Sequence, residues 1–328
     1  MIISILNALL PSFLSVPLYR LRGYKIGKNS KVKIGTLIIS KDVTIGSNVN
    51  IGPLCLIKSK SFAIGNNSTI KPLVFLKTNY VTINSYVQIS GPTVISGDDT
   101  PNSRFEIGDH SRIFPNCWLE TGEGIFIGKQ TGIGGESQLF THGYWTSYLK
   151  RGPRALGPII IKDDVYVGWR SFITPNVTLE NNCVIAANTV ISKDVREYNI
   201  MGGAPARVLR KIEDTVLSTE EFQEKTEDIF NSIYDYSIYK KYDTERIAAG
   251  TVSINGIIVT IDKEKIKDKN DVLLLYNVPD KDKKNILENS GNNIIDLDDY
   301  IAFIKNNNKE LQFVITHLRK FGIRLYFK

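Results

Sequence analysis

The 328-residue sequence has few cysteines, few histidines and no long hydrophobic run. No apolar stretch reaches the roughly 20 residues that a helix needs to cross a bilayer, so a membrane-spanning helix is not expected. The three cysteines, Cys55, Cys117 and Cys183, lack the close spacing typical of metal sites, and their odd number excludes complete pairing in disulfides. We expect them to be buried thiols in a reducing cytosol.

The charged residues give the sequence a positive balance. The net charge is +7, and no compact run of Arg and Lys is interleaved with aromatic residues, which argues against nucleic acid as a partner. A positive balance suits anionic partners such as a nucleotide-like cofactor, an acidic glycan or lipid headgroups. A lysine-rich background composition is an equally simple interpretation.

A six-residue periodicity dominates residues 26–191. Aliphatic residues recur at every sixth position in triplets, which are Ile26, Val32 and Ile38; Ile45, Ile51 and Ile57; Ile64, Ile70 and Leu76; Ile83, Ile89 and Ile95; Ile107, Ile113 and Leu119; Ile127, Ile133 and Leu139; Ile161, Val167 and Ile173; Leu179, Ile185 and Ile191. A period of six is neither the helical period nor the strand period alone, and it suits a short strand followed by a turn. Three such sides would close one triangular coil of about eighteen residues.

The residues beside the repeated aliphatic positions support this interpretation. Glycine or asparagine often follows them, as at Gly27, Gly46 and Asn84, and both residue types tolerate the dihedral angles of tight corners. Parallel strands of successive coils would exchange backbone hydrogen bonds. Each inward side chain would contribute about 1.5–3 kcal/mol before entropy is subtracted. The periodicity therefore predicts an all-β solenoid with a continuous aliphatic core.

These repeats resemble those of the hexapeptide-repeat acyltransferases. They are most similar to the galactoside and maltose O-acetyltransferase branch and its polysaccharide-modifying relatives, over residues 23–212. The resemblance implies a left-handed parallel β-helix that uses acetyl-CoA as co-substrate and needs no metal. It also implies a homotrimer with active sites between subunits, because a lone stack exposes long flat faces and two open ends.

Two segments interrupt the periodicity, at residues 96–106 and 141–158, and loops on a solenoid are where chemistry is expected. His142 lies at the start of the longer segment, and the resemblance matches it to the general base of the family. An imidazole with an ordinary pKa near 6.5 can take a proton from a sugar hydroxyl. The implied reaction is direct attack of that hydroxyl on the thioester. The implied oxyanion donor is the backbone N–H of Trp169, where the family commonly has a small residue.

Four other residues are candidates for binding the acceptor. The resemblance suggests Asn116 as an orienting residue, and a left-handed corner asparagine is the alternative. Glu136 lies six residues before His142, where it would either orient the imidazole or face solvent. Tyr144 and Trp145 would stack on sugar rings, although a loop that packs on the neighbouring coil explains them as well.

A second motif closes the periodic region. Ala-Asn-Thr-Val-Ile-Ser-Lys-Asp-Val, followed by Gly-Gly-Ala-Pro-Ala-Arg-Val-Leu-Arg-Lys-Ile, resembles the coil end and exit signature of the family. The resemblance implies that these segments line the coenzyme A arm and bind its phosphates, to which Arg is well suited. The residues implied are Ala187, Ser192, Lys193, Arg207 and Arg210. For Arg207, a structural bond to the turn is the alternative.

Two segments flank the periodic region. Residues 1–22 are apolar and interrupted by prolines, and we expect either a helical cap on the open end of the coils or attachment to a membrane surface. Residues 213–328 predict a small α/β domain of unknown role. Its expected elements are a helix that begins with a capping box at Ser218–Glu221 and ends near residue 241, a hairpin within 251–261, a strand at 272–276, a helix at 296–306, and strands at 312–315 and 323–327.

The function implied by the resemblance is an acetyl-CoA-dependent O-acetyltransferase. Its acceptor would be a sugar of a bacterial surface polysaccharide of O-antigen or capsule type, modified in the cytoplasm or at the inner face of the membrane. N-acetylation of a nucleotide-linked amino sugar is the alternative. A zinc hydratase needs three ligating histidines, and the coil region has only His110 and His142. A non-catalytic solenoid fits the histidine and the exit motif less well.

Overall fold

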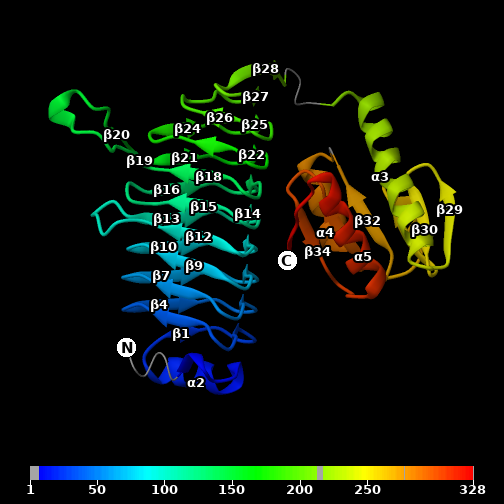
Figure 1. Cartoon of the computed structure of the whole chain (residues 1–328). Coiled ribbons are helices and arrows are strands. Elements are labelled where there is room, and N and C mark those ends of the chain that lie inside the picture. The colour runs from blue at the N-terminus through cyan, green and yellow to red at the C-terminus, as the bar shows by residue number, and fades with distance from the viewer. Residues whose placement is uncertain (1–6, 213–216, 277, 328) are drawn as a thin grey trace. The chain divides into compact units, whose positions relative to one another are not determined.

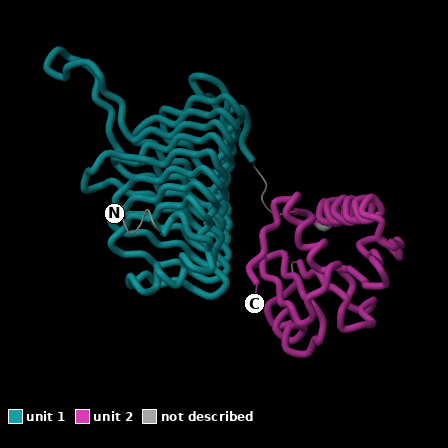
Figure 2. Tube along the Cα trace, turned by 60° about the horizontal axis from the view of Figure 1, so that its bottom comes forward, with its two compact units in different colours: residues 1–213 teal, residues 214–328 magenta. Residues whose placement is uncertain are grey.

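The computed structural model describes residues 7–212, 217–276 and 278–327. The chain divides into two compact units, Met1–Glu213 and Asp214–Lys328 (Figure 2). The buried apolar residues of unit 1 form one cluster, and those of unit 2 form clusters of their own. Each unit is therefore a domain with its own core.

Unit 1 is a stack of triangular coils whose sides form three parallel sheets (Figure 1). Sheet 1 contains β1 (Lys25–Ile26), β4 (Asp42–Ile45), β7 (Ser61–Ile64), β10 (Tyr80–Ile83), β13 (Arg104–Ile107), β16 (Ile125–Ile127), β21 (Ile159–Ile161) and β24 (Val177–Leu179). Sheet 2 contains β2 (Lys31–Val32), β5 (Asn50–Ile51), β8 (Thr69–Ile70), β11 (Gln88–Ile89), β14 (Arg112–Ile113), β17 (Gly132–Ile133), β22 (Tyr166–Val167), β25 (Val184–Ile185), β27 (Asn199–Gly202) and an antiparallel last strand, β28 (Arg207–Lys211). Sheet 3 contains β3 (Leu37–Ile39), β6 (Leu56–Lys58), β9 (Val74–Lys77), β12 (Thr93–Ser96), β15 (Trp118–Glu120), β18 (Gln138–Phe140), β23 (Phe172–Ile173) and β26 (Val190–Ile191).

The periodic aliphatic residues point into the stack. In sheet 1, Ile83 pairs in register with Ile64 on one side and Ile107 on the other, and each is at most 2% exposed. The same holds along the other two sheets, so the repeated residues form one continuous core. The three cysteines are free and buried, which confirms the expectation of buried thiols.

The three edges of the prism differ in backbone conformation. At the edge between sheets 1 and 2, and at the edge between sheets 2 and 3 (the 2–3 edge), corner residues adopt positive φ, as at Asn48 with φ 58° and Leu54 with φ 58°. The edge between sheets 3 and 1 (the 3–1 edge) carries both long excursions of the chain. One spans residues 97–103 between β12 and β13, and the other spans residues 141–158 between β18 and β21. The second includes β19 (His142–Gly143), β20 (Ala155–Leu156) and the short helix η1 (Tyr148–Lys150), and we call it the arm.

Helix α2 (Ser12–Leu21) covers the first coil (Figure 1). The Ser12 hydroxyl accepts from the Val32 N–H at 3.0 Å, and Tyr19 is fully buried. The outer face of the helix keeps Phe13 at 75% exposure and Leu21 at 83%. Among the described residues, no helix has both the length and the apolar character needed to span a membrane.

Unit 2 combines a seven-stranded mixed sheet with three α-helices. Its elements are α3 (Thr219–Tyr239), β29 (Thr244–Ala248), β30 (Thr251–Ile254), β31 (Ile257–Thr260), η2 (Lys263–Lys265), β32 (Val272–Leu275), α4 (Asp280–Asn289), β33 (Asn293–Asp296), β34 (Ile301–Phe303), α5 (Lys309–Leu318), η3 (Arg319–Phe321) and β35 (Tyr326–Phe327). Phe230 and Ile233 of α3 and Val314 of α5 share one buried cluster with residues of the sheet.

Several elements of unit 2 lie where the sequence predicts them, and two do not. Ser218 and Glu221 form the predicted capping box of α3, and the predicted hairpin turns at Asn255-Gly256 with positive φ. The expected helix at 296–306 is wrong, because this segment contains a turn followed by β34. The expected strand at 312–315 is also wrong, because it lies inside α5.

We predict that the stability of unit 2 falls on mild acidification because of His317. This side chain is 1% exposed and its Nε2 lies 2.9 Å from the Ser232 hydroxyl. Burial, assisted by the charge of Lys320, lowers the pKa of His317 from 6.5 to about 4. Between these values the unfolded chain binds the extra proton, so the His317 contribution is complete above pH 6.5 and is lost as the pH falls toward 4.

The expected loss at pH 5 is about 2 kcal/mol, measured as the calorimetric melting of unit 2. His317→Gln should make this melting much less dependent on pH between 7.5 and 5. Equal pH dependence of the variant and the natural chain would contradict the assignment.

Candidate active site

His142 forms a close pair with a carboxylate at the base of the arm. Its Nδ1 lies 2.9 Å from Oε2 of Glu120, which belongs to β15 one coil below. The Glu120 side chain is 10% exposed and the imidazole is 31% exposed. The carboxylate is therefore sheltered, whereas the histidine remains open to solvent.

The surrounding backbone fixes the Glu120 carboxylate. Oε1 accepts from the Gly122 N–H at 2.8 Å, and Oε2 accepts from the N–H of Thr141 at 3.2 Å and from its hydroxyl at 2.5 Å. The Thr141 oxygen in turn accepts from the Glu123 N–H at 3.0 Å. These donors fix the position of the carboxylate. It can then accept a hydrogen bond from the Nδ1–H group of His142.

This arrangement sets the tautomer of a neutral His142. A proton on Nδ1 that is donated to Glu120 leaves the lone pair on Nε2. A histidine held in this way can remove a proton from a group that approaches Nε2, and the carboxylate stabilises the imidazolium that results. The pair thus has the geometry of a general base with its orienting partner.

The arm carries the two aromatic candidates. Tyr144 lies beside the imidazole, with ring centroids 5.0 Å apart, and is 51% exposed. Trp145 is 98% exposed. The structure therefore brings Tyr144 to the histidine and leaves Trp145 in solvent.

Within one copy, Glu136 lies away from the imidazole, so it does not orient the His142 of its own chain. Its Oε2 lies 2.7 Å from Nε of Arg170 at the 2–3 edge, and its backbone has a φ of 61°. Glu120 takes the orienting position instead. The coil register holds a signal for it, because Leu119 pairs with Leu139 and Glu120 with Phe140, next to Thr141 and His142.

The 2–3 edge also carries Asn116 and Trp169. Asn116 adopts the left-handed corner conformation, with φ 63°. Trp169 follows β22 and its ring lies 5.9 Å from that of Phe114. Pro53 and Pro115 fill the equivalent corner position in other coils. Proline has no N–H, so a residue at this corner does not have to donate a backbone hydrogen bond to a neighbouring coil. The N–H of Trp169 at the same corner is therefore available to another acceptor.

The residues implied for coenzyme A are spread over the upper coils. Ala187 follows β25 at the 2–3 edge, one coil above Trp169. Its backbone nitrogen lies so close to Gly168 that a Cβ atom on this glycine would meet it at 2.5 Å. Ser192 and Lys193 follow β26 at the 3–1 edge and are exposed. Arg207 and Arg210 lie on β28 and are also exposed.

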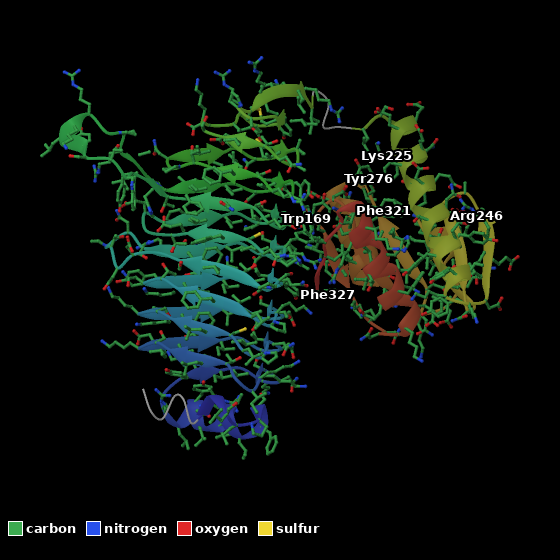
Figure 3. The ribbon with its side chains drawn as sticks, viewed as in Figure 1. Trp169, Lys225, Arg246, Tyr276, Phe321 and Phe327 are labelled. Atoms are coloured by element: carbon green, nitrogen blue, oxygen red, sulfur yellow. The ribbon has the colours of Figure 1, made fainter. Side chains whose placement is uncertain are left out.

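Within one chain, the candidate residues fall on two separate edges of the prism. His142, Glu120 and Tyr144 lie at the 3–1 edge, whereas Asn116 and Trp169 lie at the 2–3 edge. Figure 3 shows Trp169 on the side of unit 1 away from the arm. Sheet 3 separates the two groups, so a single copy does not bring His142 and Trp169 together.

The buried thiols Cys117 and Cys183 do not supply a nucleophile. Burial raises the pKa of Cys117 and of Cys183 to about 11. A neutral, buried thiol is a poor nucleophile. Direct transfer by a base fits this site better than a covalent intermediate on cysteine.

We predict that neutral His142 carries its proton on Nδ1. Two-bond ¹H–¹⁵N correlation spectra at pH above about 8, where an ordinary imidazole is neutral, should show this tautomer. The chain has three histidines, so the His142→Ala spectrum assigns the signal. Glu120→Gln should populate the Nε2–H form. Both carboxylate oxygens of Glu120 accept hydrogen bonds, whereas the NH2 group of a glutamine can only donate.

Glu123→Gln is the matched control, since Glu123 bonds the Asn102 side chain at 2.8 Å and not the imidazole. A spectrum of His142 that is unchanged by Glu120→Gln would show that the carboxylate does not set the tautomer.

Comparison with known proteins agrees with the periodicity. A family model described as the hexapeptide repeat of succinyl-transferase matches residues 158–193. Galactoside O-acetyltransferase of Escherichia coli is 32% identical over 108 residues, which cover 33% of this chain and 44% of that protein. Galactoside O-acetyltransferase of Lactococcus lactis is 28% identical over 112 residues, which cover 34% of this chain and 54% of that protein. The chain thus spans about half the length of these curated relatives.

A solved hexapeptide-repeat acetyltransferase of Vibrio cholerae, complexed with acetyl coenzyme A, is 25% identical to this chain. The match covers 55% of this chain and 72% of that one, with a TM-score of 0.32. The six-residue repeats and the three parallel sheets agree with these similarities. The chain carries a hexapeptide-repeat segment at residues 158–193 and is similar to hexapeptide-repeat acetyltransferases, and this similarity implies that its parallel β-helix is left-handed.

Proposed function

We propose that unit 1 is an acetyl-CoA-dependent O-acetyltransferase with His142 as its general base. Its acceptor is a hydroxyl of a sugar in a bacterial surface polysaccharide, of O-antigen or capsule type. The observation that carries this proposal is the His142–Glu120 pair, in which a sheltered carboxylate orients a partly exposed imidazole. The names of the galactoside O-acetyltransferase relatives support acetyl transfer to a sugar.

The reaction follows from the free lone pair on Nε2. The acceptor hydroxyl gives its proton to Nε2 as its oxygen bonds to the carbonyl carbon of the thioester. The tetrahedral intermediate carries its negative charge on the former carbonyl oxygen. When it collapses, the carbon–sulfur bond breaks, and the coenzyme A thiolate takes the proton from the imidazolium. The Glu120 carboxylate keeps its contact with Nδ1 and stabilises the cation between these two transfers.

A threefold assembly would complete this site. If the sheet 3 faces of three parallel copies surround a common axis, the 2–3 edge of each copy meets the 3–1 edge of the next. The Trp169 N–H of one copy would then approach the His142 of its neighbour and act as the oxyanion donor. The proposal therefore includes a homotrimer whose active sites lie between subunits.

The outer face of sheet 3 supports this assembly. One outward column of this sheet is apolar at nearly every coil, and its members are Leu37, Leu56, Phe75, Val94, Trp118, Phe172 and Val190. Trp118 is 49% exposed and Phe75 is 36% exposed. The equivalent outward column of sheet 2 is polar in its first coils, with Lys31, Asn50 and Thr69. Burial of the sheet 3 face thus removes more apolar surface from water than burial of the sheet 2 face in these coils.

Acetyl-CoA would bind near the upper coils. We propose that Ala187 lines the pantetheine groove and that Ser192 and Lys193 contact the same arm. Arg207 and Arg210 on the exposed β28 are placed to bind phosphates. N-acetylation of an amino sugar uses the same base and stays the alternative, and mass spectrometry of the acetylated product separates the two.

His142→Ala should lower turnover by roughly 10²–10⁴, the usual contribution of a positioned base. Coenzyme A binding, measured by calorimetric titration, should stay unchanged because the imidazole does not hold the cofactor. His317→Gln in unit 2 is the matched control and should keep full turnover. Loss of coenzyme A binding by His142→Ala would indicate a structural role, and retained turnover would exclude the general base.

Light scattering of the purified chain should give three times the chain mass of 36.8 kDa. Trp118→Glu should shift this value toward one chain, because a carboxylate in the centre of a buried apolar face is strongly unfavourable. Tyr80→Glu, at a 42% exposed position of sheet 1, is the control and should not change the mass. A natural chain that is monomeric at all concentrations would refute the shared site.

A further inference from the structure

A hollow with an excess of basic side chains lies on the 3–1 edge of the lower coils. It has a volume of about 460 Å³, and its basic residues are Arg22, Lys41, Lys58, Lys60 and Lys77. We call it the lysine groove. The proposed reaction at His142 does not use any of these residues.

The lysines are stacked from coil to coil. Lys58 of β6 and Lys77 of β9 are direct partners in sheet 3. Lys41 and Lys60 occupy successive corners, where the Lys41 N–H donates to the Lys60 carbonyl at 3.2 Å. Like charges on neighbouring strands repel and destabilise a sheet. Such an arrangement is favourable when an anion lies among the charges.

The carboxylates of the groove neutralise only part of its charge. Asp98 and Asp99 also line it, and Asp99 pairs with Lys60 at 2.9 Å and accepts from the Asn79 amide at 2.8 Å. Lys60 holds the pKa of Asp99 below its ordinary value, so this carboxylate stays ionised. Within the described part of the chain, no ion pair is recorded for Lys41, Lys58 or Lys77.

The groove and His142 lie along the same edge. The excursion at residues 97–103 forms the upper end of the groove, and His142 lies two coils higher, a distance of about 10 Å at the spacing of paired strands. Hydrogen bonds connect the two places. Thr100 donates to the Gly122 carbonyl, Asn102 donates to Glu123 at 2.8 Å, and Glu123 donates to Thr141.

We propose that the lysine groove binds the carboxylate or phosphate groups of an acidic saccharide chain while one of its sugars lies at His142. This inference rests on the proposed function and names the class of its acceptor as an anionic polysaccharide. The groove extends over several coils parallel to the prism axis, which suits an extended chain with a charge on successive sugars. A neutral acceptor would leave the part of this positive charge that Asp98 and Asp99 do not neutralise without a counter-charge.

The test measures binding without acetyl-CoA, so that it does not depend on turnover. The probe is oligogalacturonate, which carries one carboxylate per sugar, and the neutral reference is a maltooligosaccharide of equal length. Calorimetric titration of the full chain should detect the acidic probe only, and its affinity should fall with added salt. Lys58→Gln/Lys77→Gln should weaken binding about tenfold.

The matched control is Lys31→Gln/Lys33→Gln, which removes the same charge from exposed positions of the sheet 2 side. It should weaken binding less than about twofold, because only long-range screened interactions change. Equal weakening by both double variants, or equal binding of the neutral probe, would overturn the proposal. So would a change in the mass of the assembly in Lys58→Gln/Lys77→Gln, which would make these lysines interface residues.

Two further results separate this proposal from its alternatives. Vesicles containing phosphatidylglycerol that bind the natural chain but not Lys58→Gln/Lys77→Gln, together with no binding of oligogalacturonate, would assign the groove to a membrane surface and overturn the saccharide assignment. Groove-dependent binding of oligogalacturonate, together with absence of acetyl transfer to any acceptor, would support the groove and refute the proposed function.

Discussion

The stacking of inward aliphatic side chains, each on its equivalent in the next coil, governs the structure of unit 1. A single coil of short strands buries nothing by itself, and its hydrogen-bonding groups need a coil above and a coil below. The core therefore requires equal coils in a constant register. This leaves the three flat faces and the edges as the places where the sequence can vary without loss of the core.

The chemistry of the site follows from this freedom at the edges. Two edges turn through residues in the left-handed conformation and keep a fixed length. The 3–1 edge lacks this repeated corner and accommodates the arm and the 97–103 excursion. The register then places Glu120 directly below the base of the arm, where Gly122 and Thr141 hold its carboxylate. A rigid stack thus positions His142, although the rest of the arm extends into solvent.

The periodicity predicts much of unit 1 because one physical requirement repeats at each coil. It predicts the inward residues, the corners and the two interruptions, and Asn116 lies in the corner conformation that was the alternative for it. It does not predict that Glu120, rather than Glu136, contacts the imidazole. That contact joins residues of different coils, and sequence proximity to His142 pointed to Glu136. The periodicity also does not assign the candidate residues to two edges, because this needs the side of the coil on which each residue lies.

Unit 2 is harder to predict because residue type and residue spacing favour different secondary structures in the same segment. Residues 312–315 include β-branched and aromatic side chains that favour a strand, yet Leu311, Val314 and Leu318 recur at helical spacing and Asn308 caps the helix. At 296–306, the Asp296 carboxylate accepts the backbone N–H groups of Asp298 and Asp299, which makes a turn where a helix was expected. The buried clusters that decide between these options join segments far apart in the chain.

The two ends of the coil stack are closed by different means, and this limits how the protein can grow. At one end α2 covers the first coil, and at the other the antiparallel strand β28 follows the last parallel strand of sheet 2. A parallel β-helix without such covers would offer its open ladder to another copy and polymerise into fibres. Here α2 covers the first coil and β28 pairs with the last parallel strand of sheet 2, which hinders axial elongation and favours sideways association through the faces and edges of unit 1.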